Sequence, residues 1–186
     1  EKIITNCGSI EKKIGKNPDY LRFSAAHSTI ILNNTNISEL VLKKSYKRIP
    51  KKILFLSEET DDFVSWNSSH DGYLQNFHKI VKRKINISKK NNEIFGEDSI
   101  ISNKVGLEKN VFSIRFHLMP ECNCIVTNNY HSVIIRTKNG QNWLFKSEAK
   151  ITLEDSIYVG KGKSVEQNKQ IVINGTVHDN KIIKKW

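Results

Sequence analysis

The chain has 186 residues, which suits one domain large enough to bury a core without disulfide staples. Its net charge of +11 favours an anionic partner: an acidic polysaccharide, a nucleic acid or a membrane surface. The excess of lysine over arginine, with many asparagines and isoleucines, also fits a strongly AT-biased genome, and both explanations stay open. No apolar run approaches the roughly 18 residues that cross a bilayer, which argues against a membrane span.

Two further features limit the class of protein. The three cysteines are Cys7, Cys122 and Cys124, an odd number with one very tight spacing, so we expect plain thiols and no disulfide framework. The chain opens on Glu1 without an initiator methionine, a basic n-region or an apolar h-region. We therefore expect it to be a fragment of a longer protein, with any targeting signal outside it.

Alternation of apolar and polar residues with period two dominates, which predicts an all-β chain. In chain order, the expected strands are Lys2–Asn6, His27–Leu32, Ile53–Ser57, Phe63–Asn67, His78–Ser88, Glu93–Ser102, Val111–Met119, His131–Thr137, Asn142–Lys146, Ile151–Val159 and Gln170–Val177. The turn signals between them are Asn33-Asn34, Lys89 to Asn92, Asn128-Asn129, Asn139-Gly140, Gly160 to Gly162 and Asn174-Gly175. So many strands predict a large antiparallel two-sheet β-sandwich, super-sandwich-like in size, over residues 1–186.

Three connecting segments carry specific predictions. Asn139-Gly140 predicts a hairpin with a type I′ turn, because both residues accept positive φ. Residues 40–52 form the most concentrated basic segment, which we expect to be a loop before the strand that starts at Ile53. The polar stretch Lys161–Lys169 predicts an exposed loop.

His27 follows two alanines and precedes Ser28 and Thr29. Small neighbours leave room for a ligand, and imidazole titrates near neutrality, which suits proton transfer. Taken alone, however, a single histidine at the start of a strand is more often structural.

His70 lies in Ser69-His70-Asp71-Gly72-Tyr73, where Asp71 could orient the imidazole and Gly72 permits a tight turn. A plain turn between two strands is the competing interpretation. For His78 and His117 the residues favour ordinary structural roles, on a strand face and partly buried beside Arg115 respectively. The sequence contains no Gly-rich phosphate loop, Gly-x-Ser-x-Gly or His-Glu-x-x-His motif, so common hydrolase chemistries lose support.

Several segments, in order, resemble the C-terminal β-domain of the heparinase II/III family of polysaccharide lyases. They are Ile3–Gly8, Arg22–Thr29, His70–Tyr73 with the basic strand Lys79–Ile85, Gly96–Asp98, Arg115–Leu118, Gly140–Phe145, Asp155–Tyr158 and Gln170–Val172. Each motif is only moderately specific, whereas their ordered combination covers essentially the whole chain.

The resemblance implies a β-sandwich that follows an N-terminal (α/α) toroid, absent from this chain, with the active cleft between them. It implies β-elimination on a uronic-acid-containing polysaccharide, with His27 as a catalytic residue. Arg22, His70 and Tyr73 would bind substrate or support the site. The family often has asparagine directly after this histidine, where this sequence has Ser28. The isolated chain should be inactive, because the toroid supplies the other acid/base groups.

The resemblance leaves further expectations. No cofactor is assigned with certainty, although a structural divalent metal is possible because some relatives bind one in the β-domain. Its ligands are unknown, and His70 is the one candidate. The expected partners are acidic polysaccharide and the toroid, and the expected compartment is the periplasm or cell envelope. One alternative is a non-catalytic carbohydrate-binding module that stacks sugars on Trp66, Tyr73 and Trp143. Nucleic-acid binding through the basic segment Lys43–Lys52 is disfavoured, because no aromatic recognition motif accompanies it.

Overall fold

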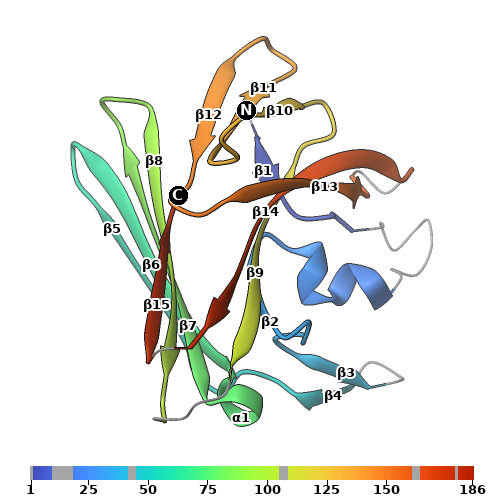
Figure 1. Cartoon of the computed structure of the whole chain (residues 1–186), viewed down its shortest axis with the longest axis vertical. Helices are drawn as coiled ribbons and strands as arrows, with labels where there is room; N and C mark the ends of the chain where they lie inside the picture. Colours follow the sequence, from blue (N-terminus) through green and yellow to red (C-terminus); the bar gives the residue numbers. More distant parts are fainter. Residues whose placement is uncertain (1, 10–18, 42–44, 105–108, 161–163, 179) are drawn as a thin grey trace. The chain divides into compact units, whose positions relative to one another are not determined.

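A computed structural model describes residues 2–9, 19–41, 45–104, 109–160, 164–178 and 180–186. The chain divides into two compact units (Figure 1). Unit 1 comprises Glu1–Asn36 and Phe112–Gly175, and unit 2 comprises Ile37–Val111 and Thr176–Trp186. Nearly all regular structure in the described residues is strand, and the sheets are antiparallel, which confirms the all-β prediction and is consistent with the sandwich class.

Unit 1 is built on one five-stranded sheet with the order β1-β9-β14-β13 and with β2 also paired to β9. The strands are β1 (Ile4–Thr5), β2 (Ile30–Leu32), β9 (Asn110–Leu118), β13 (Ile151–Tyr158) and β14 (Glu166–Val177). Two 3-10 turns, η1 (Asp19–Arg22) and η2 (Ser24–Ala26), precede β2. A separate three-stranded sheet has the order β10 (Asn123–Val126), β11 (Ser132–Arg136) and β12 (Asn142–Lys146).

A short parallel bridge links the two ends of the strand order in unit 1. Gly8, just after β1, pairs with Val159, just after β13. Gly8 has φ of +82°, and a Cβ there would lie 2.3 Å from the Val159 carbonyl oxygen, so only glycine allows this approach. The sheet therefore curves back on itself at this end, and the residues after β1 lie beside the end of β13.

The core of unit 1 comes from the alternation that the sequence shows. Ile114, Phe116 and Leu118 of β9 are at most 1% exposed, and Phe116 packs against Phe145 with ring centroids 5.0 Å apart. Gly175 lies inside β14, where glycine leaves room for the Phe112 ring: a Cβ there would lie 2.5 Å from it. The turn predicted at Asn174-Gly175 is therefore wrong.

Unit 2 is built on a second five-stranded sheet, with the order β15-β8-β7-β6-β5. Its strands are β5 (Ile53–Glu59), β6 (Phe63–Tyr73), β7 (Lys79–Ser88), β8 (Glu93–Ser102) and β15 (Lys181–Lys185), and the short helix α1 (Leu74–Phe77) joins β6 to β7. Trp186, directly after the C-terminal strand, is held by a largely buried ion pair: Arg83 donates to both oxygens of Asp98 at 2.7 and 2.8 Å, and Trp186 Nε1 donates to the same carboxylate at 2.9 Å. No helix in the described part of the chain is long and apolar enough to cross a membrane.

Two predicted loops contain strands. The basic segment predicted as a loop at residues 40–52 includes parts of a hairpin, β3 (Glu39–Val41) and β4 (Ser45–Arg48), although residues 42–44 lie outside the described residues. Within Lys161–Lys169, residues 161–163 also lie outside them, and β14 already begins at Glu166. A short strand rich in polar and charged residues has the same composition as a loop, so the sequence alone could not distinguish the two.

The hairpin predicted at Asn139-Gly140 is confirmed, but its turn type is wrong. Only Gly140 has positive φ, +81°, while Asn139 does not. The Gly140 N–H donates to the Thr137 carbonyl at 3.0 Å, and the Thr137 N–H donates to the Gln141 carbonyl at 2.9 Å. This is the three-residue hairpin loop in which glycine ends a type I turn. Two successive positive φ values occur instead at Asn33 and Asn34.

Asp98→Asn should lower the free energy of unfolding by about 3 kcal/mol, because it removes the charge that compensates the largely buried Arg83 guanidinium. Equilibrium urea unfolding measures the loss. The matched control is Asp155→Asn, which breaks an ion pair to Lys169 whose carboxylate is 91% exposed and should cost less than about 1 kcal/mol. Equal losses in the two variants would contradict this assignment.

Candidate functional site

His27 lies at the end of the turn η2, where the chain leaves the 3-10 conformation for extended backbone. Its φ and ψ are −126° and 150°, and its N–H donates to the Ser24 carbonyl at 3.1 Å. The side chain is half-buried. Buried Leu21 of η1 and Ala26 of η2 pack with Cys7 and Val159, so apolar contacts fix the segment that carries His27.

The backbone on both sides of His27 is hydrogen-bonded to the end of β1 and to the residues that follow it. On one side the Cys7 N–H donates to the Ala26 carbonyl at 2.8 Å. On the other side the Ser28 N–H donates to Asn6 Oδ1 at 2.9 Å, and Ser28 Oγ donates to the Thr5 carbonyl at 2.5 Å. The serine that stands where the family often has asparagine thus anchors the backbone next to His27.

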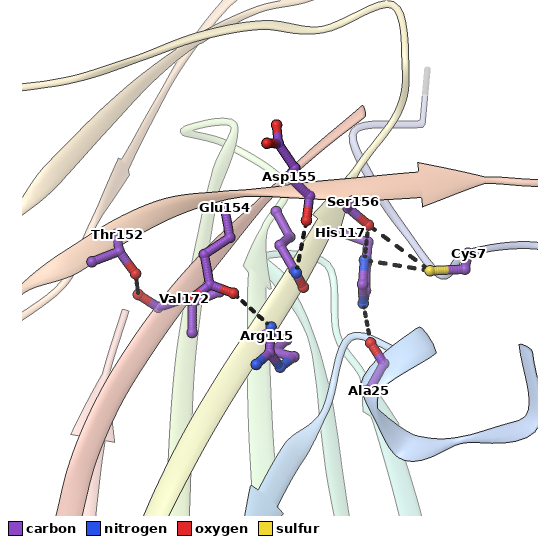
Figure 2. Close-up of polar contacts among 10 residues, drawn as sticks. Cys7, Ala25, Arg115, His117, Thr152, Glu154, Asp155, Ser156 and Val172 are labelled. Carbon is purple, nitrogen blue, oxygen red and sulfur yellow. Dashed lines mark hydrogen bonds and ion pairs between the residues drawn. The ribbon is translucent and has the colours of Figure 1, made fainter. Parts of the chain in front are cut away.

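His117 fixes the same segment from β9 (Figure 2). Its Nε2 lies 2.9 Å from the Ala25 carbonyl oxygen, which can only accept, so Nε2 carries the hydrogen. Its Nδ1 therefore accepts from Ser156 Oγ at 2.7 Å. The His117 backbone N–H also donates to Ser28 Oγ at 2.9 Å. One residue thus contacts the chain on both sides of His27.

Cys7 completes this cluster. Its Sγ lies 3.6 Å from His117 Nδ1 and 3.9 Å from Ser156 Oγ. Burial raises the pKa of the Cys7 thiol, partly opposed by a hydrogen bond with Ser156, so Cys7 is a buried thiol and no nucleophile. All three cysteines of the chain are free thiols.

The two imidazoles of this region differ in access to solvent. His117 is 1% exposed, and its burial lowers its pKa to about 4. The hydrogen bond to the Ala25 carbonyl partly opposes this shift, and the charges of Arg115 and His27 add to it in smaller measure. Burial also lowers the pKa of His27, partly opposed by the backbone of Leu21. Both imidazoles are therefore neutral at pH 7, but only His27 retains surface that a ligand can reach.

Arg115, two residues before His117 in β9, adds a third connection. Its backbone N–H donates to the Thr29 carbonyl at 3.0 Å, and its guanidinium pairs with Glu154 at 2.9 Å. Glu154 and Ser156 alternate along β13 as Arg115 and His117 do along β9, so both pairs connect the same two strands (Figure 2).

Arg22 closes the turn η1, five residues before His27, and forms an ion pair with Asp19 at 3.7 Å. Its side chain is 30% exposed, so part of the guanidinium reaches solvent. The structure thus places both Arg22 and His27 in the two turns before β2.

His70 and Tyr73 belong to unit 2, where they lie together with ring centroids 5.8 Å apart. The Gly72 N–H donates to His70 Nδ1 at 3.3 Å, while none of the described residues offers the buried His70 Nε2 a hydrogen-bond partner. Burial lowers the pKa of His70, partly opposed by Asp71. Tyr73 is fully buried, so its contribution to any site is to pack against His70 and Phe77.

The turn that holds His70 depends on residues outside its own motif. Asp71 accepts the backbone N–H groups of Lys51 and Lys52 at 2.8 and 3.0 Å, so this carboxylate orients backbone and not the His70 imidazole. Arg48, only 8% exposed, donates to the carbonyls of Ile37 and Gly72. One arginine of the predicted basic loop is therefore an internal support of this turn.

The described residues contain no group of three or more His, Cys, Asp or Glu side chains close enough to hold a metal ion. His70 has an unpartnered buried nitrogen, but no second ligand accompanies it in these residues. They do not provide a metal site by themselves.

Comparison with known proteins identifies the family. The model of the heparinase II/III-like C-terminal family matches residues 1–186. The chain belongs to this family. No curated protein sequence matches it significantly.

Solved structures show the same fold. The whole chain superposes on heparan sulfate lyase HepC from Pedobacter heparinus with a TM-score of 0.69 and 13% identity, and on a mutant of that protein with a TM-score of 0.70 and 13% identity. It also matches a heparinase III with methylated lysines, with a TM-score of 0.68 and 12% identity. In each case the heparinase-like chain spans 28% of the solved chain's length.

Acid should destabilise the fold through His117. The pKa of His117 is about 4 in the folded chain and near 6.5 in the unfolded chain. Its contribution to the free energy of unfolding is therefore complete above about pH 6.5 and is lost as the pH falls towards 4. The shift corresponds to about 3 kcal/mol. His117→Gln can replace both side-chain hydrogen bonds but does not titrate, so its unfolding free energy should fall less steeply between pH 6.5 and 4 in urea unfolding.

The control is His178→Gln, at an exposed histidine, which should keep the slope of the natural chain. His27 and His70 titrate in the same direction, so the informative quantity is the difference in slope between the variants. An unchanged slope in His117→Gln would show that His117 is not held neutral by burial.

Proposed function

We propose that this chain is the β-domain of a polysaccharide lyase that cleaves uronic-acid-containing polysaccharide by β-elimination, and that His27 acts as an acid/base group. The observation that carries the proposal is the contrast around His27. Hydrogen bonds from β1, Asn6, Cys7 and β9 hold its backbone on both sides, while its imidazole is only half-buried. A fixed backbone with an accessible side chain is what proton transfer at a defined atom requires.

β-Elimination needs three things of the protein. The uronate carboxylate must be neutralised, the C5 proton must be removed, and the departing oxygen at C4 must receive a proton as the C4–C5 double bond forms. A neutral imidazole has a free lone pair for the C5 proton, and the lowered pKa keeps His27 in that form at pH 7. After the transfer, the imidazolium can return its proton to the C4 oxygen or to solvent.

Substrate binding is assigned to cationic groups near this histidine. Arg22 lies in the turn before it and offers a guanidinium that binds carboxylate or sulfate with two hydrogen bonds. The net charge of +11 attracts a polyanion over longer distances. From the family resemblance, His70, which packs against buried Tyr73, is also proposed to support substrate binding.

The proposal includes a second domain. The solved relatives are more than three times as long as this chain, and the family resemblance implies an (α/α) toroid that supplies a tyrosine and an asparagine or histidine. This chain alone should therefore bind substrate weakly and turn nothing over. The periplasm or cell envelope remains the predicted compartment.

A carbohydrate-binding module without catalysis is the second candidate. Trp66 is 39% exposed, and a pocket in unit 2 is lined by the aromatic residues Phe95 and Trp186 and by the charged residues Lys84, Glu97 and Lys185, which suits stacking and polar contacts with a sugar. Tyr73, which this alternative also used for stacking, is fully buried and cannot contact a sugar.

In the full-length protein, His27→Ala should reduce lyase turnover by about 10²- to 10⁴-fold, the usual contribution of a general acid or base. Ultraviolet absorbance of the unsaturated uronate product measures it on heparan sulfate, hyaluronan, alginate and polyglucuronate. His178→Ala is the control and should behave as the natural protein. Unchanged turnover in a folded His27→Ala variant would favour the binding-module alternative.

Arg22→Ala should raise KM for the polysaccharide about tenfold or more with little change in kcat, because a charged hydrogen bond to the carboxylate or sulfate is lost in substrate and transition state alike. Arg22→Lys should recover part of this affinity, since it keeps the charge but not the bidentate geometry. Arg136→Ala, at an exposed arginine of β11, is the control. A fall in kcat at constant KM would assign Arg22 to the chemical step instead.

A further inference from the structure

The outer edge of the unit 2 sheet is a long apolar strand. β5 is the terminal strand of the order β15-β8-β7-β6-β5, and all seven of its residues are exposed. Its four apolar side chains are between 63% and 69% exposed: Ile53, Leu54, Phe55 and Leu56. Four consecutive apolar residues this exposed, on both sides of a strand, are unusual for a surface in water.

Directly opposite these side chains, β6 carries polar residues, beginning with His70 opposite Ile53. On β6, Ser69 stands opposite Leu54, Ser68 opposite Phe55 and Asn67 opposite Leu56. Ile53 to Leu56 also contains no proline, no bulge and no charge, which are the devices that protect sheet edges from pairing. The residues of β5 are therefore those of a strand that pairs with a neighbour on both sides, with β6 on one side and with a second strand on the outer side.

The backbone of β5 determines which residues such a partner can meet. The Asp71 N–H donates to the Lys52 carbonyl at 3.2 Å, so the backbone of Lys52 faces β6. Because backbone direction alternates along a strand, Leu54, Leu56 and Glu58 also face β6. The N–H and C=O groups of Ile53, Phe55, Ser57 and Glu59 point outward, where the described residues supply no further strand.

The charges at the two ends of β5 are complementary to each other. Lys51 and Lys52 precede the strand, and Glu58 and Glu59 end it, all four exposed. In an antiparallel pair of two copies related by a two-fold axis at Phe55, Lys51 lies opposite Glu59, Lys52 opposite Glu58, and Leu54 opposite Leu56. Glu59 already pairs with Lys89 at 2.7 Å, and a carboxylate can accept from a second ammonium.

The neighbouring two-fold registers lack this match. An axis at Leu56 places Glu58 and Glu59 opposite Leu54 and Ile53. An axis at Leu54 places Lys51 and Lys52 opposite Ser57 and Leu56. Axes between residues are excluded, because they would set an outward-facing backbone group opposite an inward-facing one.

We propose that β5 is a homodimer interface, in which two copies of this chain pair antiparallel about Phe55 and join their unit 2 sheets into one. The interface is isologous, so each copy contributes the same strand. Main-chain hydrogen bonds form at Ile53, Phe55 and Ser57, and the ion pairs at both ends select the register. This association is independent of the lyase activity proposed above.

The first test is Phe55→Cys in the full-length protein under mild oxidation. Phe55 meets its own copy in a hydrogen-bonded pair, whose Cα separation of about 5.5 Å suits a disulfide. More than half of the protein should migrate as a covalent dimer on non-reducing gels. Ser57→Cys is the matched control: it meets Ile53 of the other copy and should not cross-link above the background of the natural cysteines. Absence of the Phe55→Cys cross-link would overturn the proposal and assign the edge to another part of the longer chain.

The second test reverses charges and follows mass by light scattering across protein concentrations. Lys52→Glu sets two carboxylates opposite each other and should raise the dimer dissociation constant at least tenfold. Adding Glu58→Lys to the same chain restores opposite charges and should restore the dimer. A protein that is monomeric throughout, a dimer that Lys52→Glu leaves unchanged, or a double variant that stays monomeric would each overturn the pairing.

Discussion

The hydrogen bond from His117 to the Ala25 carbonyl is the interaction on which the arrangement around His27 depends. It joins β9 to the turn η2, while the other nitrogen of the same imidazole joins β9 to Ser156 of β13. Since the imidazole is fully buried, leaving either nitrogen unpaired would cost about 1 to 3 kcal/mol. The three segments are therefore held in one arrangement.

Two histidines beside the same turn, His117 and His27, have different environments. His117 is enclosed, with both nitrogens bonded and a pKa of about 4, so its imidazole cannot exchange protons with a ligand at neutral pH. His27 follows the turn that His117 fixes and keeps surface for a ligand. The environment, and not the residue type, separates a positioning histidine from a proposed acid/base histidine.

Strand content was predictable from residues because each strand carries its own period-two pattern. Glu93–Ser102 and Asn142–Lys146 match β8 and β12 at both ends. The missed strands, β3, β4, β10 and β15, are short or rich in charged and polar residues, so their pairing depends on a neighbour and not on their own pattern. The turn at Asn139-Gly140 was misassigned because the same dipeptide fits a two-residue and a three-residue loop.

For the candidate site, the sequence by itself determined the all-β class, the family resemblance and the candidates Arg22, His27 and His70, since these follow from local pattern and motif. Only the tertiary structure decided that His117 is buried and bonded on both sides, that Asn6 and Ser28 anchor the backbone beside His27, and that Tyr73 has no surface. These properties come from contacts between residues up to 92 positions apart. Burial and hydrogen-bond partners at such separations are set by the packing of strands, which no local pattern encodes.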